Sequence, residues 1–211
     1  ALPILILFSE LFIVIFIVKV RAYVWLTFLL IFLISIPVLS LYVFDDYHIK
    51  RFNAFLNPEA YAKTTAYQTI QATFAIGSGK IFGKGFTKGP ISKGKFVPEQ
   101  KTDFAFSVWA EEFGFVGSLF LVIMYLVLLI FLTKATYHCA DHFGFYLSIM
   151  IIGYISSQII INLLMVSGLF PVVGVPLPLF SYGGTNMLTT LSSIGIIMSI
   201  YVRRYFFAYP E

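Results

Sequence analysis

The carboxyl group of Asp103 is the clearest candidate for a catalyst in this sequence. It follows Pro98, which ends any preceding helix, and it precedes an apolar stretch with helical spacing that begins at Phe104. A carboxylate held beside a basic loop could take a proton from a hydroxyl group and so act as a general base. Asp is also a favoured N-cap, the residue that begins a helix, so a purely structural role for Asp103 stays open.

A glycine- and lysine-rich segment lies shortly before this carboxylate. Residues 77–86 have glycine at four of their first nine positions, including Gly83 and Gly85. Glycine lets the backbone approach a ligand closely and lets successive N–H groups form a concave anion site. The range 80–103 has a net charge of +4, which would suit a phosphate or diphosphate ligand, but the residues alone favour a flexible loop that faces anionic lipid or water, because no P-loop spacing is present. Its lysines are Lys80, Lys84, Lys88, Lys93, Lys95 and Lys101.

The remaining polar groups favour structural roles. Glu10 lies within an apolar stretch, which predicts a hydrogen bond or ion pair inside the membrane. Gln158 and Asn162 are one helical turn apart and predict a polar stripe that faces another helix rather than a transport path. His138 and His142 are spaced for metal binding, but the sequence offers no third ligand, so we interpret them as part of a solvated turn and predict no metal site.

The elements that position these groups must sit in lipid. Of 211 residues, 59% are hydrophobic and 11% are charged, whereas soluble domains average about 25% charged residues. Cys139 is the only cysteine, which excludes a disulfide scaffold, and a net charge of +4 gives little support to nucleic-acid binding. The chain opens Ala1-Leu2-Pro3 without a Met or a signal peptide, so we expect a piece of a longer membrane protein.

Five apolar stretches are long enough to span a bilayer, since ~20 residues at ~1.5 Å each cross its hydrocarbon core. The predicted fold is therefore an all-α polytopic membrane protein that forms a single membrane domain over residues 1–211. A long polar loop, which ends in the start of a helix, covers residues 45–112 and carries the candidate active site. Within this loop, the pattern over 61–76 predicts a helix that lies on the membrane surface. The Gly- and Pro-rich stretch 167–185 predicts a loop. The predicted spans are 2–18, 24–44, 113–133, 144–166 and 186–202.

The short loops between the spans predict the orientation. If the spans alternate, five Lys and Arg residues of the short loops fall on one side, which is then the cytoplasmic side. The long polar loop holds nine Lys and Arg, but loops longer than about 60 residues cross the membrane largely regardless of charge. We therefore expect 45–112 and 167–185 to lie outside the cell. The five short-loop residues are Lys19, Arg21, Lys134, Arg203 and Arg204.

Three sequence runs resemble the SEDS family of peptidoglycan polymerases, whose members include RodA, FtsW and SpoVE. They read AIGSGKIFGKGF, FVPEQKTDFAFSVWAEEFGFVG and NLLMVSGLFPVVGVPLPLFSYGGTNML, and KRFNAFLNPE precedes them. Together they cover residues 50–200 in family order and spacing, and MVSGLFPVVGVPLPL is more similar to the elongation members (RodA) than to the division members (FtsW). Two residues depart from the family pattern, because Lys101 stands where a His is usual and Lys80 where a Gly is usual.

The resemblance implies a fold of ten transmembrane helices, of which this chain would supply helices six to ten. It implies an inverting glycosyltransferase that polymerises lipid II, an undecaprenyl-diphosphate-linked disaccharide peptide, at the outer face of the bacterial cytoplasmic membrane for cell elongation and shape. Asp103 would be its catalytic base, and a fragment without the other half would be inactive. The implied partners are a class B penicillin-binding protein (a transpeptidase) and membrane lipids, with no nucleic acid.

The resemblance also implies which residues bind the substrate. The diphosphate would be held by the Gly- and Lys-rich segment or by a divalent metal such as Mg²⁺ or Mn²⁺, and the cofactor is otherwise unknown. The residues implied to bind substrate are Lys80, Lys84, Lys88, Gly83, Gly85, Glu99, Ser181, Tyr182 and Gly183.

Two other functions stay open. A lipid flippase or transporter would also be polytopic, but it would mark its path with ionisable groups or broken helices inside the spans, which are nearly free of charge here. A non-catalytic scaffold for a transpeptidase would use polar helix faces such as Gln158 and Asn162, and it would leave Asp103 without a role.

Overall fold

The computed structural model describes residues 27, 30, 46–64, 66–94, 99–139 and 141–208, and within them the chain is all-helical, as predicted. Glu10 and the first predicted span lie outside the described residues, as does the second predicted span apart from Thr27 and Leu30, which are helical. The helices are α3 (Asp46–Leu56), α4 (Tyr67–Gly79), α5 (Pro90–Lys93), α6 (Ala105–Tyr137), α7 (His142–Val166) and α8 (Gly184–Ala208).

Three of the predicted spans are confirmed as helices that are long and apolar enough to cross a membrane. They are α6, α7 and the Gly184–Arg203 part of α8. Helix α7 is the inner helix of the three, since 44% of its most apolar stretch is buried against 11% for each of the others. The core between them is apolar and includes one residue of the 167–183 loop. Its buried members are Tyr125, Leu132, Ala135, Ile155, Ile159, Leu177 and Ile197.

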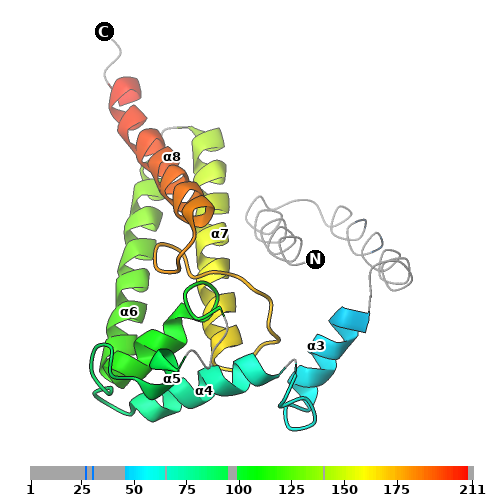
Figure 1. Cartoon of the computed structure of the whole chain (residues 1–211). Coiled ribbons are helices and arrows are strands. Elements are labelled where there is room, and N and C mark those ends of the chain that lie inside the picture. The colour runs from blue at the N-terminus through cyan, green and yellow to red at the C-terminus, as the bar shows by residue number, and fades with distance from the viewer. Residues whose placement is uncertain are drawn as a thin grey trace.

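A short turn places α6 and α7 side by side (Figure 1). Asp141 ends this turn as the N-cap of α7, because its carboxylate accepts a hydrogen bond of 2.8 Å from the backbone N–H of Gly144. His138 and His142 are both exposed here, as expected of a solvated turn. The loop after α7 starts at the opposite end of the bundle and runs back beside the helices to the start of α8 (Figure 1).

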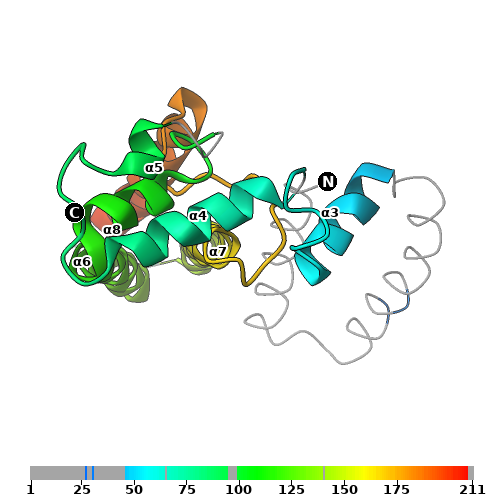
Figure 2. The same ribbon diagram turned by 60° about the horizontal axis from the view of Figure 1, so that its bottom comes forward.

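Helix α4 lies across the ends of α6 and α7 at that opposite end (Figure 1, Figure 2). It begins six residues later than the predicted surface helix, at Tyr67, and ends at Gly79. Its buried face consists of the small residues Ala72, Ala75 and Gly79, whereas Phe74 is 64% exposed. Small side chains let α4 approach α6 closely: a Cβ atom on Gly79 would overlap the backbone oxygen of Ala110.

Candidate active site

Asp103 lies in the turn immediately before α6 and does not cap that helix. Helix α6 begins at Ala105, its N-cap position is Phe104, and no side chain makes a capping hydrogen bond there. The structural alternative for Asp103, an N-cap, is therefore wrong. Its carboxylate accepts no hydrogen bond from any group in the described part of the chain.

The backbone of Asp103 is fixed from two sides. The next residue, Phe104, is 1% exposed and packs with Ala72 of α4 and Met165 of α7. On the other side, the amide of Asn162 donates hydrogen bonds of 2.8 Å to the backbone oxygen of Asp103 and 2.6 Å to that of Val175. Asn162 is fully buried, so these bonds are shielded from water. They hold Asp103 against the loop that follows α7.

The loop after α7, residues 171–183, forms the wall that faces the carboxylate. A Cβ atom on Gly174 would lie 3.1 Å from Oδ2 of Asp103, and Gly174 has a φ of +73°, which favours glycine. The backbone N–H groups of Val173 and Gly174 donate to the sulfur of Met165 at 3.3 and 3.4 Å. Farther along, the hydroxyl of Tyr125 donates to the backbone oxygen of Pro178 at 2.6 Å. This wall is therefore tied to both α6 and α7.

The electrostatic setting makes Asp103 a stronger base than an ordinary aspartate. Burial raises the pKa of this carboxyl group, the negative charge of Glu99 raises it further, and the positive charge of Arg51 lowers it in part. A higher pKa increases the affinity of the carboxylate for a proton, which suits a general base. The arrangement can accept a proton from a substrate hydroxyl group that lies within hydrogen-bond distance of Oδ2.

Three predicted substrate-binding residues lie next to the Asp103 turn. The backbone N–H of Tyr182 donates to the backbone oxygen of Lys101 at 2.8 Å, and both residues line an open cavity of about 530 Å³. Tyr182 is 78% exposed, whereas Ser181 is buried and its hydroxyl accepts a hydrogen bond from Leu177 N–H at 2.9 Å. Ser181 therefore shapes the loop from inside. The cavity is lined by Lys101, Phe180, Ser181, Tyr182, Gly183, Gly184 and Met187.

The glycine-rich segment does not form the predicted anion site from its backbone N–H groups. Gly83 N–H donates to the Gly79 oxygen at 2.8 Å, Lys84 N–H to the Glu111 oxygen at 3.0 Å, and Gly85 N–H to that of Glu112 at 2.9 Å. The N–H groups that were to cradle a phosphate are thus already bonded to carbonyl oxygens. Gly83 and Gly85 therefore offer no free N–H group to a phosphate, and a role for them in substrate binding stays a prediction.

Instead, this segment completes a break in α6. Gly114 has non-helical angles (φ 66°, ψ −159°), so the helix loses its own hydrogen bonds there. Phe115 N–H donates to the Lys80 oxygen at 2.8 Å and Val116 N–H to the Ile81 oxygen at 3.1 Å, while the carbonyls just before the break accept from Lys84 and Gly85. In lipid such freed backbone groups must find partners within the protein.

The lysines of this segment divide into two kinds. Lys84 pairs with Glu111 at 3.2 Å, and the Glu111 side chain is 1% exposed. Lys80 and Lys88 are exposed, as is Glu99 beside the carboxylate. Glu111 is six residues beyond the start of α6 at Ala105, or about 9 Å along the helix, so the segment docks at some distance from the Asp103 turn.

Sequence reasoning missed three residues of this site. Asn162 was interpreted as a contact to another helix, yet it bonds two loop backbones. For Gly174 the sequence predicts only a position in a loop, and for Arg51 only one basic residue among several in the long polar loop. The order KRFNAFLNPE in the family resemblance was the one signal that could have drawn attention to Arg51.

Comparison with known proteins gives one family. The model of the cell cycle protein family FtsW/RodA/SpoVE matches residues 3–205. Peptidoglycan glycosyltransferase RodA of Treponema pallidum is 35% identical over 188 residues, covering 87% of this chain and 43% of that protein. Peptidoglycan glycosyltransferase MrdB of Escherichia coli K12 is 40% identical over 171 residues, covering 80% and 46%.

A solved structure has the same fold. It is a chain of a peptidoglycan synthase complex that coordinates polymerization and crosslinking. It superposes on this chain with a TM-score of 0.70 at 28% sequence identity. The match covers 95% of this chain and 55% of the other. The chain thus spans about half the length of the proteins it matches.

Proposed function

The chain belongs to the FtsW/RodA/SpoVE family of cell cycle proteins, the SEDS family, and from this premise we propose that it is part of a peptidoglycan glycosyltransferase that polymerises lipid II. The observation that carries the proposal is the Asp103 carboxylate. Its backbone is fixed at both sides, its pKa is raised, and no described group occupies it with a hydrogen bond. A carboxylate kept in this state by the fold is suited to accept a proton.

In the proposed reaction Asp103 acts on the acceptor sugar. The C4 hydroxyl oxygen of the acceptor forms a bond to the anomeric carbon of the donor, and its proton passes to Asp103. The bond between that carbon and the diphosphate oxygen breaks, and its electron pair leaves with the diphosphate. Attack from the side opposite the leaving group inverts the anomeric centre. A diphosphate leaves without protonation by a general acid, because cations can neutralise its charge, so one carboxylate is enough where glycosidases usually use two.

The negative charge of the leaving diphosphate needs a cation. Lys80 and Lys88 are exposed and remain predicted ligands, while Lys84 is already paired with Glu111. The described residues contain no group of three His, Cys, Asp or Glu that could hold a metal ion. A Mg²⁺ or Mn²⁺ ion held by one or two carboxylates together with the diphosphate itself stays a prediction. We therefore assign no step to a metal.

The test is Asp103→Asn in the full-length protein with its transpeptidase partner, assayed by glycan formation from purified lipid II. We expect the rate to fall by about 10²–10⁴, the usual contribution of a positioned base, because an amide cannot accept the proton. Asp141→Asn is the matched control, since Asp141 is a true N-cap and Asn caps equally well. Near-normal polymer from a stable Asp103→Asn protein would contradict the proposal and favour a flippase or scaffold.

The same variant makes a stability prediction of definite sign. Because the folded-state pKa of Asp103 is raised, the folded protein binds this proton more tightly than the unfolded chain does. The resulting stabilisation is present below the ordinary carboxyl pKa and is lost as pH rises through the raised value. At neutral pH Asp103→Asn should therefore melt at the same temperature as the natural protein or higher. A clear drop in melting temperature would indicate a structural role.

We further propose that the partner is a class B penicillin-binding protein and that the site faces outward from the bacterial cytoplasmic membrane. The partner is supported by the fold shared with a complex that coordinates polymerization and crosslinking. The orientation is supported by the short-loop charges.

Orientation can be tested with an impermeant thiol reagent in spheroplasts. Cys139 is a poor reporter, because burial raises the pKa of its thiol and lowers its reactivity on either side. In a Cys139→Ala background, single cysteines should replace Lys93 and His138, which are both exposed at opposite ends of the bundle. We expect Lys93→Cys to react in intact spheroplasts and His138→Cys only after permeabilisation. The reverse pattern would overturn the orientation and the mechanism.

A further inference from the structure

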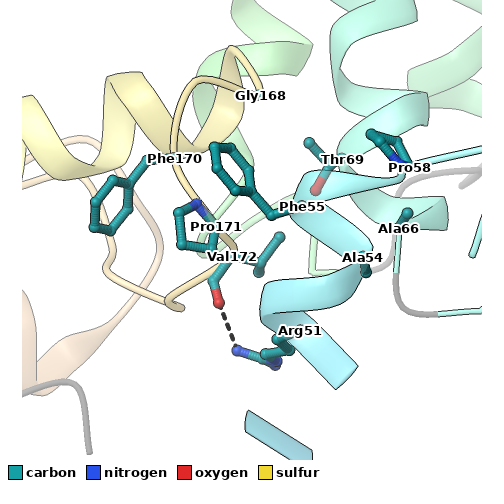
Figure 3. Close-up of a pocket in the computed structure, with 10 residues that line it drawn as sticks. All are labelled: Arg51, Ala54, Phe55, Pro58, Ala66, Thr69, Gly168, Phe170, Pro171 and Val172. Carbon is teal, nitrogen blue, oxygen red and sulfur yellow. Dashed lines mark hydrogen bonds between the residues drawn. The ribbon is translucent and has the colours of Figure 1, made fainter. Parts of the chain in front are cut away.

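Helix α3 meets the site at the loop that follows α7. Its side chains adjoin residues 168–172 of that loop, and Ala66 and Thr69, at the start of α4, line the same space (Figure 3). A small cavity of about 40 Å³ lies between them, walled mainly by apolar side chains that include Phe55, Phe170 and Pro171. At its edge a guanidinium N–H of Arg51 donates a 2.8 Å hydrogen bond to the backbone oxygen of Val172 (Figure 3).

With that hydrogen bond, the loop is fixed on both sides of Gly174. The backbone oxygen of Val172 is held by Arg51 on one side, and that of Val175 is held by Asn162 on the other. Between these two points Gly174 faces Oδ2 of Asp103 closely enough that a Cβ atom would stand 3.1 Å from it. The position of this wall relative to the carboxylate therefore depends on Arg51 as well as on Asn162.

Arg51 also contributes charge. Two ionisable groups act on the Asp103 carboxyl group, namely Glu99 in the same turn, which raises its pKa, and Arg51 on α3, which lowers it. Helix α7 and the 171–183 loop present Asn162, Met165 and uncharged backbone to this turn. Arg51 is thus the positive group acting on the candidate base within the described part of the chain, and it comes from a separate helix.

We propose that Arg51 is a positioning residue of the site, which holds the 172–175 segment beside Asp103 and supplies the positive charge that offsets Glu99. The proposal rests on Asp103 being the base. It makes the docking of α3 a requirement for full activity, since an undocked α3 removes both the hydrogen bond and the charge. Arg51 itself touches no reacting atom in this scheme.

The experiment measures kcat against pH for the full-length enzyme with its partner, with lipid II as the substrate. Arg51→Gln should lower kcat at neutral pH by about 10- to 100-fold, the scale of a displaced catalytic group, and should move the acid limb of the profile to higher pH. Arg51→Lys retains the positive charge but not the planar guanidinium group. The acid limb of its pH profile should therefore lie closer to that of the natural enzyme. Glu99→Gln removes the opposing charge and should move the limb to lower pH.

Opposite displacement of the acid limb by Arg51→Gln and Glu99→Gln is the result expected. An acid limb that stays in place in Arg51→Gln, with kcat reduced and melting temperature lowered, would overturn the proposal and leave Arg51 a loop staple only. If Arg51→Gln does not fold, the Arg51→Lys and Glu99→Gln profiles decide the same question. Failure of the proposed function has a different signature, because it requires an active Asp103→Asn enzyme.

Discussion

The Asp103 turn and the Gly- and Lys-rich segment before it are both polar, and the fold uses their polar groups in opposite ways. In the segment, the N–H groups of Gly83, Lys84 and Gly85 all donate to carbonyl oxygens, and Lys84 pairs with Glu111. In the turn, the backbone is bonded, while the Asp103 carboxylate receives no hydrogen bond from the described residues. The carboxylate that has no partner among the described residues is available to a ligand, whereas the bonded groups of the segment serve the structure.

The largest expected effects come from substituting two glycines, Gly83 in the segment and Gly174 in the loop that faces the Asp103 turn. A Cβ atom on Gly83 would overlap the backbone oxygen of Glu112, and its φ is +78°, so Gly83→Ala should cost about 3–5 kcal/mol of unfolding free energy. On Gly174 the nearest atom is Oδ2 of Asp103 at 3.1 Å, so Gly174→Ala should cost about 1–2 kcal/mol for the left-handed backbone but lower kcat about 10- to 100-fold.

The measurements are thermal melting in detergent and glycan formation by the full-length proteins. A Gly83→Ala protein that melts normally would show that the segment does not dock on α6 as described. Normal kcat in Gly174→Ala would remove the 171–183 loop from the site.

The next effect concerns Asn162, whose amide joins the two sides of the site. Asn162→Leu leaves the buried backbone oxygens of Asp103 and Val175 without a donor, at about 1–3 kcal/mol each. Activity should fall together with stability, because the Asp103 turn and the loop after α7 both lose the hydrogen bond that holds them. Gln158→Met is the control: Gln158 lies one turn away on the same buried stripe, and its Oε1 has no hydrogen bond to the described residues. Equal losses in both variants would mean that the stripe matters only for packing.

The smallest effects should separate the lysines. Lys84→Gln removes the partner of a Glu111 side chain that is 1% exposed, and since Lys84 is itself 30% exposed the expected cost is about 1–2 kcal/mol, less than for a fully buried pair. Lys88→Gln is a surface change and should alter stability by less than about 0.5 kcal/mol. If exposed lysines bind the diphosphate, Lys88→Gln raises KM for lipid II while Lys84→Gln acts on melting temperature. An unchanged KM in a double Lys80→Gln and Lys88→Gln variant would remove these lysines from the substrate site.

Much of the fold followed from the sequence because lipid imposes simple requirements. Runs of apolar residues predict α6, α7 and α8 without knowledge of their neighbours, since each span satisfies its own backbone hydrogen bonds. The start of α4 was harder to predict, because its buried face is made of Ala72, Ala75 and Gly79 and carries almost no hydrophobic signal.

The site was predictable only in part, and the reason lies in long-range contacts. Asp103 could be identified by its residue type and its sequence neighbours. That it does not cap α6 depends on the exact residue at which the helix begins. Asn162 bonds to Asp103, 59 residues away in sequence, and Arg51 bonds to Val172, 121 residues away, so no local pattern connects these pairs. The glycines of 77–86 do permit close approach, as predicted, but the approaching group is the α6 backbone.

The break at Gly114 has a consequence for how the protein meets membranes of different thickness. A continuous helix from Ala105 to Tyr137 would carry its first residues along whenever the span tilted to match a thinner bilayer. At Gly114 regular helix is interrupted, but the 80–85 segment bonds to both sides of the break, at the carbonyls of Glu111 and Glu112 and at the N–H groups of Phe115 and Val116. We therefore expect the segment to hold the two parts of α6 at a fixed angle, so that a tilt of the span in a thinner bilayer still carries the Asp103 turn with it.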